Sequence, residues 1–263
     1  AVVFVVSKVF YGDNKAPKLS IVKSGFVVTE DDKKIAFDHY QNDHEKVIVL
    51  AHGFYNSKGS VLFRQMAEGL SGDYDVISMD FRGHGKSDGP FCWTAKEHQD
   101  LEAILEYAKK HYDKIGVIGF SLGAATSIIV ASNSDRISSL ISVSSPTEFK
   151  KVDGHFWKMG IMENIVYNFF QEGRFGKGVL PGSLWLKKTN PIDVVDKIHV
   201  PVLFVHGQED WLILPGHSKE LYEKANDKKK LAIVENASHA EYVYRSNREG
   251  TMRMFKDWFK ETL

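Results

Sequence analysis

The segment Gly119-Phe120-Ser121-Leu122-Gly123 decides the fold because of the residues on either side of it. Residues 114–118 are short and apolar and predict a buried strand, whereas residues 124–131 predict a packed helix. A Gly-x-Ser-x-Gly sequence between a strand and a helix predicts a sharp turn with a strained serine backbone. The flanking glycines avoid a clash with the neighbouring chain, so the turn lifts the Ser121 hydroxyl clear of the sheet.

A serine hydroxyl is a weak nucleophile until a base takes its proton and a third group orients that base. The strand predicted at 200–205 leads into Asp210, and the strand predicted at 231–235 leads to His239. Like Ser121, both follow the carboxyl end of a predicted strand, so we expect all three at one edge of the sheet. The order serine, acid, histidine predicts Ser121 as nucleophile, His239 as general base and acid, and Asp210 as the carboxylate that holds the imidazole.

Four segments in this order resemble the α/β-hydrolase superfamily, and the resemblance extends from about residue 18 to residue 263. They are His52-Gly53-Phe54, Asp80-Phe81-Arg82-Gly83-His84-Gly85-Lys86-Ser87, the turn at Ser121, and His206-Gly207-Gln208-Glu209-Asp210. The chain is similar to single-domain bacterial serine esterases, including the feruloyl/cinnamoyl esterase type, and to the catalytic domains of prolyl-oligopeptidase-like enzymes. Ala124 departs from the family pattern, in which many relatives have a second glycine after the turn.

The resemblance also assigns the acid. Glu209 stands beside Asp210 as a competing carboxylate, and the family places the acid at the second position, which favours Asp210. Glu241 and Asp193 are more distant alternatives. The resemblance implies that the other residues of these segments, such as His84 and Arg82, are structural, and we expect His52 and His206 to fix their turns by hydrogen bonding.

Acyl transfer needs donors aimed at the oxygen that becomes negative in the tetrahedral intermediate. The backbone N–H of Leu122, just after the nucleophile at a helix N-terminus, is one expected donor. The resemblance implies that the N–H of Phe54, after the third strand, is the second. The sequence lacks a His-Gly-Gly-Gly run, which argues against the hormone-sensitive-lipase type of esterase.

The coarse pattern alternates strands and helices, which predicts an α/β fold with a mostly parallel central sheet and helices on both faces. The predicted strands cover 19–29 and 33–40 as an antiparallel opening pair, then 47–51, 74–79, 114–118, 137–143, 200–205 and 231–235. The predicted helices cover 60–70, 94–112, 124–131, 215–225 and one closing helix near 239–262.

The segment of about 45 residues at 146–190 has no strand pattern and is rich in aromatic residues, so it is too long for a plain loop. In the hydrolases that the chain resembles, an insertion after the sixth strand is the usual place for a cap over the serine, so the resemblance implies a small cap here. Most of its aromatic residues should only fasten it to the body. A subset is expected to line an apolar pocket, and the candidates are Trp157 and Phe170 from the insertion with Tyr55 and Trp211 from the body.

Composition limits the other function classes. Lys and Arg together number 34, as do Asp and Glu, so no net field favours a nucleic acid. We find no cysteine–histidine cluster with metal-ligand spacing and no glycine-rich phosphate loop, so the sequence predicts neither a metal site nor a cofactor. The single cysteine, Cys92, leaves the redox compartment open.

Residues 1–17 are predicted to be an N-terminal extension to a hydrolase domain at 18–263. The apolar run Ala1-Val2-Val3-Phe4-Val5-Val6 is too short to span a bilayer, which takes about 20 residues. It is consistent with the tail of a signal or membrane anchor, or with an extra element packed on the body. A cytoplasmic location and a membrane-anchored one both remain open, and membrane association is expected only through this segment.

The sequence therefore predicts a serine hydrolase that cleaves small-molecule carboxylic esters through an acyl-enzyme, without a cofactor. The alternative with the same machinery is a prolyl-oligopeptidase-like peptidase or amidase, or a thioesterase. A third hypothesis is a ligand-binding protein that retains the hydrolase fold and has only vestigial turnover.

Overall fold

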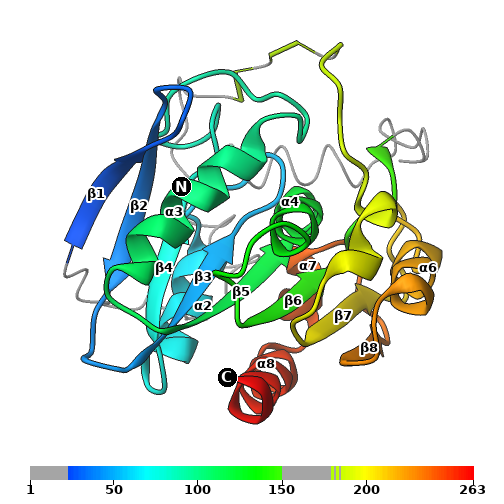
Figure 1. Cartoon of the computed structure of the whole chain (residues 1–263). Coiled ribbons are helices and arrows are strands. Elements are labelled where there is room, and N and C mark those ends of the chain that lie inside the picture. The colour runs from blue at the N-terminus through cyan, green and yellow to red at the C-terminus, as the bar shows by residue number, and fades with distance from the viewer. Residues whose placement is uncertain (1–22, 150–178, 181, 184) are drawn as a thin grey trace, which may run out of the picture.

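A computed structural model describes residues 23–149, 179–180, 182–183 and 185–263, and Figure 1 shows it as one central sheet with helices packed around it. The sheet has eight strands in the order β1-β2-β4-β3-β5-β6-β7-β8. The strands are β1 (Lys23–Val28), β2 (Lys34–Tyr40), β3 (Lys46–Ala51), β4 (Asp75–Met79), β5 (Lys114–Phe120), β6 (Ser139–Val143), β7 (Val202–Gly207) and β8 (Lys229–Val234).

The pairing of the strands confirms the predicted α/β class. β1 pairs with β2, and β2 with β4, in antiparallel register. Every pair from β4 through β3, β5, β6 and β7 to β8 is parallel. Parallel neighbours require crossover connections, and in this chain helices supply most of them.

The helices cover both faces of the sheet, as predicted. They are α2 (Val61–Ser71), α3 (Glu97–Lys109), α4 (Leu122–Ala131), α6 (Gly216–Lys224), α7 (Glu241–Ser246) and α8 (Arg248–Thr262), with short 3-10 turns η2 (Pro191–Asp193) and η3 (Val195–Lys197). Buried residues of α3, α4 and α6 form one hydrophobic cluster, and those of α2, α7 and α8 form another.

Strand β3 shows why two separate clusters form. Its side chains alternate between the faces of the sheet. Val47 and Val49 belong to the α3, α4 and α6 cluster, whereas Ile48 and Leu50 belong to the α2, α7 and α8 cluster. All four are fully buried, which explains the unbroken apolar run of this central strand.

The closing helix is the one element for which the prediction was wrong in kind. Two helices, α7 and α8, replace the single helix expected near 239–262. The break is at Asn247, whose backbone is not helical (φ −148°, ψ 81°). Its side chain accepts a hydrogen bond from the N–H of Gly250 at 2.9 Å, so Asn247 is the N-cap of α8. The helix therefore starts anew at this cap, although the apolar periodicity continues from α7 into α8.

The helix expected at 94–112 is also shorter, because α3 begins only at Glu97. Trp93 and Thr94 have positive φ angles of 55° and 72°, which a right-handed helix does not accept.

Three predictions lie wholly or partly outside the described residues. They are the extension at 1–17, residues 19–22 of the first strand, and the part of the insertion that runs from 150 to 178. Within the described ranges, no helix combines the length and apolar character needed to cross a bilayer.

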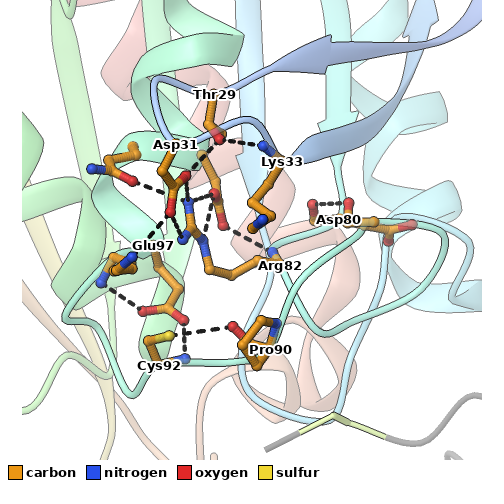
Figure 2. Close-up of polar contacts among 12 residues, drawn as sticks. Thr29, Asp31, Lys33, Asp80, Arg82, Pro90, Cys92 and Glu97 are labelled. Atoms are coloured by element: carbon orange, nitrogen blue, oxygen red, sulfur yellow. Dashed lines mark hydrogen bonds and ion pairs between the residues drawn. The ribbon is translucent and has the colours of Figure 1, made fainter. Parts of the chain in front are cut away.

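An ionic cluster anchors the antiparallel opening pair to the body (Figure 2). The buried Arg82 guanidinium, after β4, contacts Asp31 in the β1–β2 turn at 2.9 Å and Asp100 in α3 at 2.7 Å. The pKa of Asp31 lies below its usual range, mainly because Asp31 accepts a hydrogen bond from Arg82. Each member is paired, as buried charges must be, and Arg82 has the structural role that the resemblance implied.

Candidate active site

Ser121 lies between β5 and α4 in a strained backbone conformation. Its φ is 50° and its ψ is −108°, which is rare for a residue with a side chain. A Cβ on Gly119 would lie 2.5 Å from the carbonyl oxygen of Gly123, and a Cβ on Gly123 would lie 2.2 Å from that of Ala51. Both distances are too short for any side chain, so the sharp turn requires glycine at both positions, as predicted.

His239 meets Ser121 from the loop between β8 and α7. Its Nε2 lies 2.9 Å from the Ser121 Oγ, although 118 residues separate them in sequence. The next residue, Ala240, has a φ of 49°, and its N–H donates to the Ser144 Oγ at 3.1 Å. This contact connects the histidine loop to the end of β6, the central strand next to β5.

Asp210 follows β7 and contacts the far side of the imidazole. The Nδ1–H of His239 donates to Oδ2 at 2.7 Å. The other oxygen, Oδ1, accepts from the backbone N–H groups of Leu212 and Ile213 at 3.0 and 2.9 Å. Because the carboxylate accepts a hydrogen bond from Nδ1–H, the ring proton stays on Nδ1, and the unprotonated Nε2 can accept the serine proton. The three predicted residues are thus brought together in the predicted order.

The charges of the pair support this geometry. Burial opposes ionisation of Asp210, but His239 and His206 outweigh it and hold its pKa below the usual range. Burial likewise opposes charging of His239, and the attraction and hydrogen bond of Asp210 overcome it, so its pKa is raised above the ordinary value. A histidine whose charged form is stabilised in this way can take the serine proton and later give it to the leaving group.

The competing carboxylate at Glu209 is exposed, whereas Asp210 is only 2 % exposed. The structure therefore brings Asp210, and not Glu209, to the imidazole. Asp193 lies in η2. Glu241, the other alternative, is buried and bonds to Gly53 instead.

His206 makes a contact that the sequence reasoning missed. It was expected only to fix its turn, and it does so: its Nε2–H donates to the carbonyl oxygen of Ile213 at 2.7 Å, and its Nδ1 accepts from the Ser218 hydroxyl at 2.7 Å. The same Nε2 also lies 3.1 Å from Oδ2 of Asp210. The i, i+4 spacing of the two residues was the available signal.

The two expected oxyanion donors belong to two different segments, one at the start of α4 and one in the loop after β3. Leu122 is the first residue of α4, where a backbone N–H has no partner within the helix. The loop after β3 also lies near the nucleophile, because a Cβ on Gly53 would stand 3.4 Å from the Ser121 Cβ. Phe54 follows Gly53 directly, so both expected donors belong to segments next to the serine, and their role at an oxyanion stays a prediction.

The predicted pocket residues are only partly described. Tyr55 is 40 % exposed, and its ring centroid lies 4.1 Å from that of Phe54. Trp211 is half-buried beside Asp210. Trp157 and Phe170 lie outside the described residues.

The returning end of the insertion pairs with the loop after β4. The N–H of Phe91 donates to the carbonyl of Leu180 at 2.7 Å, and the N–H of Leu180 donates to that of Gly83 at 3.1 Å. Phe91 in turn packs against Phe54, with ring centroids 4.9 Å apart. This end of the insertion is therefore joined through one aromatic contact to the loop beside Ser121.

In the part of the chain that the structure describes, no group of three or more His, Cys, Asp or Glu side chains is arranged to hold a metal ion. The buried Cys92 thiol lies 3.4 Å from the carbonyl of Pro90. Burial and the charge of Glu97 raise the pKa of this thiol, which lowers the fraction of the reactive thiolate form.

The sequence is similar to a known protein family and to several individual proteins. Residues 46–175 match the family model of the α/β hydrolase fold. YqkD of Bacillus subtilis is 29 % identical over 79 % of this chain and 68 % of its own length. Caffeoylshikimate esterase of Arabidopsis thaliana is 23 % identical over 81 % of this chain and 77 % of its own length. Two further relatives are matched over only 48 % of their own lengths.

Solved structures agree with the sequence comparison. The esterase Pf2001 of Pyrococcus furiosus superimposes with a TM-score of 0.76 at 24 % identity, over 95 % of this chain and 95 % of the esterase. At that identity the likeness shows the fold. Together with the matched family model and the sheet order, it shows that the chain belongs to the α/β-hydrolase superfamily.

Proposed function

We propose that this hydrolase cleaves carboxylic esters through an acyl-enzyme. The observation that carries the proposal is the continuous chain of contacts from the Ser121 Oγ to His239 at 2.9 Å and from His239 to Asp210 at 2.7 Å. The similarity to Pf2001 and to caffeoylshikimate esterase, both of which are esterases by name, supports the same reaction class.

The first half of the reaction forms the acyl-enzyme. The Ser121 Oγ attacks the ester carbonyl carbon while the His239 Nε2 takes its proton. The carbonyl oxygen becomes negative, and the N–H groups of Leu122 and Phe54 stabilise it. His239, now an imidazolium stabilised by Asp210, gives the proton to the leaving alkoxide, and the carbon–oxygen bond breaks to release the alcohol.

The second half uses the same groups on water. The His239 Nε2 takes a proton from a water molecule as its oxygen attacks the acyl carbon. The tetrahedral intermediate then collapses, the bond to the Ser121 Oγ breaks, and His239 returns the proton to the serine. The carboxylic acid leaves, so the net reaction consumes one ester and one water and no cofactor.

Hydrolysis of p-nitrophenyl esters from acetate to palmitate tests the proposal. The wild-type protein is expected to release p-nitrophenol, and Ser121→Ala to lose this activity while it stays folded. The chain-length optimum would define the acyl class. Cleavage of an aminoacyl-prolyl amide in the absence of ester cleavage would favour the peptidase alternative. Saturable ligand binding that survives Ser121→Ala, in a protein with no turnover, would favour a binding function.

A further inference from the structure

Glu241 has a buried carboxylate that the proposed reaction does not use. It is the first residue of α7, two residues after His239, and it is 8 % exposed. Its Oε1 accepts hydrogen bonds from the backbone N–H of Gly53 at 3.2 Å and from the Nδ2 of Asn56 at 3.1 Å. The carboxylate thereby joins the histidine loop to the loop after β3, 188 residues earlier in the chain.

Gly53 lies close both to this carboxylate and to the nucleophile. A Cβ there would stand 2.9 Å from the Glu241 Oε1 and 3.4 Å from the Ser121 Cβ. A shift of Glu241 therefore leaves the Gly53 N–H without its hydrogen-bond acceptor, in a segment that lies close to the nucleophile.

The carbonyl of the same glycine is held by His52. The N–H of Phe81 donates to the His52 Nε2 at 3.0 Å, so the ring proton is on Nδ1, which donates to the Gly53 oxygen at 2.7 Å. That oxygen and the Phe54 N–H belong to one planar trans peptide and point in opposite directions. The hydrogen bonds of the Gly53 N–H and of the Gly53 carbonyl oxygen therefore set the direction of the Phe54 N–H.

We propose that Glu241 is a positioning residue that holds the loop of Gly53 and Asn56 so that the Phe54 N–H faces the oxyanion formed at Ser121. The inference rests on the proposed ester hydrolysis, because the oxyanion arises in acyl transfer. Since α7 begins directly after the histidine loop, one element locates both the base and this amide. A displacement of about 1 Å at such a group costs on the order of 100-fold in rate.

Three variants test the role. Glu241→Ala removes the acceptor and is expected to lower kcat for a p-nitrophenyl ester by about 10- to 100-fold, with KM changed less than about threefold. Glu241→Gln keeps an acceptor oxygen at the same reach and is expected to recover most of this loss. The matched control is Glu235→Gln, an exposed glutamate that precedes the same histidine loop, and its kinetics should equal those of the wild type.

Hydrogen–deuterium exchange supplies a measurement that does not depend on turnover. Amides 53–56 are expected to exchange faster in Glu241→Ala than in the wild type, and at the wild-type rate in Glu235→Gln. If the alanine variant does not fold, Asn56→Ala removes one contact to the same carboxylate and should lower kcat about three- to tenfold.

The outcomes separate this inference from the proposed function. A wild-type kcat in the alanine variant, or in Asn56→Ala if the alanine variant does not fold, would overturn the positioning role. So would an increase in KM alone. A wild-type protein that cleaves no ester, while exchange at 53–56 still rises in Glu241→Ala, would remove the ester chemistry and retain Glu241 as the residue that holds the loop.

Discussion

His206 and His239 share one oxygen of Asp210. The His239 Nδ1 lies 2.7 Å from Oδ2 and the His206 Nε2 lies 3.1 Å from the same atom. Asp210 is therefore held from two sides, by the imidazole that it orients and by a buried histidine at the end of its own strand.

This relationship predicts that His206→Leu lowers kcat about tenfold, because a hydrogen bond to a charged group contributes about 1.5–3 kcal/mol and its loss frees the carboxylate to turn. Steady-state kinetics measures the effect. Ser218→Ala, which removes only the bond at the far side of the His206 ring, is the milder comparison. An unchanged kcat in His206→Leu would show that the backbone amides alone hold Asp210.

The identity of the acid gives a second prediction. Asp210→Asn is expected to lower kcat by about 10⁴-fold, as the corresponding change does in serine proteases, because the amide stabilises the wrong imidazole tautomer. Glu209→Gln, one residue away but exposed, should retain full activity. Equal losses in the two variants would contradict the assignment.

The pH dependence of activity gives a third prediction. The reaction needs neutral His239, and Asp210 raises the pKa of that histidine. The acidic limb of the kcat/KM profile should therefore have its midpoint above about 6.5, the value for free histidine. In Asp210→Asn the residual activity should show this midpoint at lower pH. A profile that is flat from pH 5 to pH 8 would argue against His239 as the base.

The nucleophile turn gives a fourth prediction, for stability. Gly123→Ala places a methyl group 2.2 Å from the Ala51 carbonyl oxygen, where backbone cannot move aside, so we expect a loss of several kcal/mol or failure to fold. Gly72→Ala is the control, because nothing lies within 4 Å of its Cβ position. It should change the free energy of unfolding by less than about 1 kcal/mol, as urea denaturation of both variants would show.

A buried histidine far from the site gives a fifth prediction. His39 lies between the hydroxyls of Tyr107 and Tyr112, at 3.1 and 2.8 Å, and burial lowers its pKa to about 4. The unfolded chain, with a pKa of about 6.5, binds more protons between these values. The stabilisation from this site is complete above pH 6.5 and falls by up to about 3 kcal/mol as the pH drops to 4.

Urea denaturation across pH 4 to 7 measures this effect. The slope should be smaller in His39→Gln than in the wild type, whereas His199→Gln, at an exposed position, should keep the wild-type slope. The same slope in all three proteins would assign the pH dependence to other groups.

The sequence was most informative where a few consecutive residues carry the constraint. The turn at Ser121 needs glycine at two fixed positions, and the five consecutive residues 119–123 are enough to recognise it. The order of Ser121, Asp210 and His239 was likewise readable, because each follows an apolar strand and parallel strands end at one edge of a sheet. The alternation along the chain indicated the class of the fold for the same local reason.

Tertiary structure decided what depends on contacts between distant segments. Glu209 and Asp210 are adjacent carboxylates with similar chemistry, and only the path of the loop after β7 buries one and exposes the other. Glu241 is 188 residues from Gly53, so no local pattern reveals their bond. Local sequence determines the conformations that a segment can adopt, whereas the packing of the sheet and its helices determines which polar groups lose water and must find a partner.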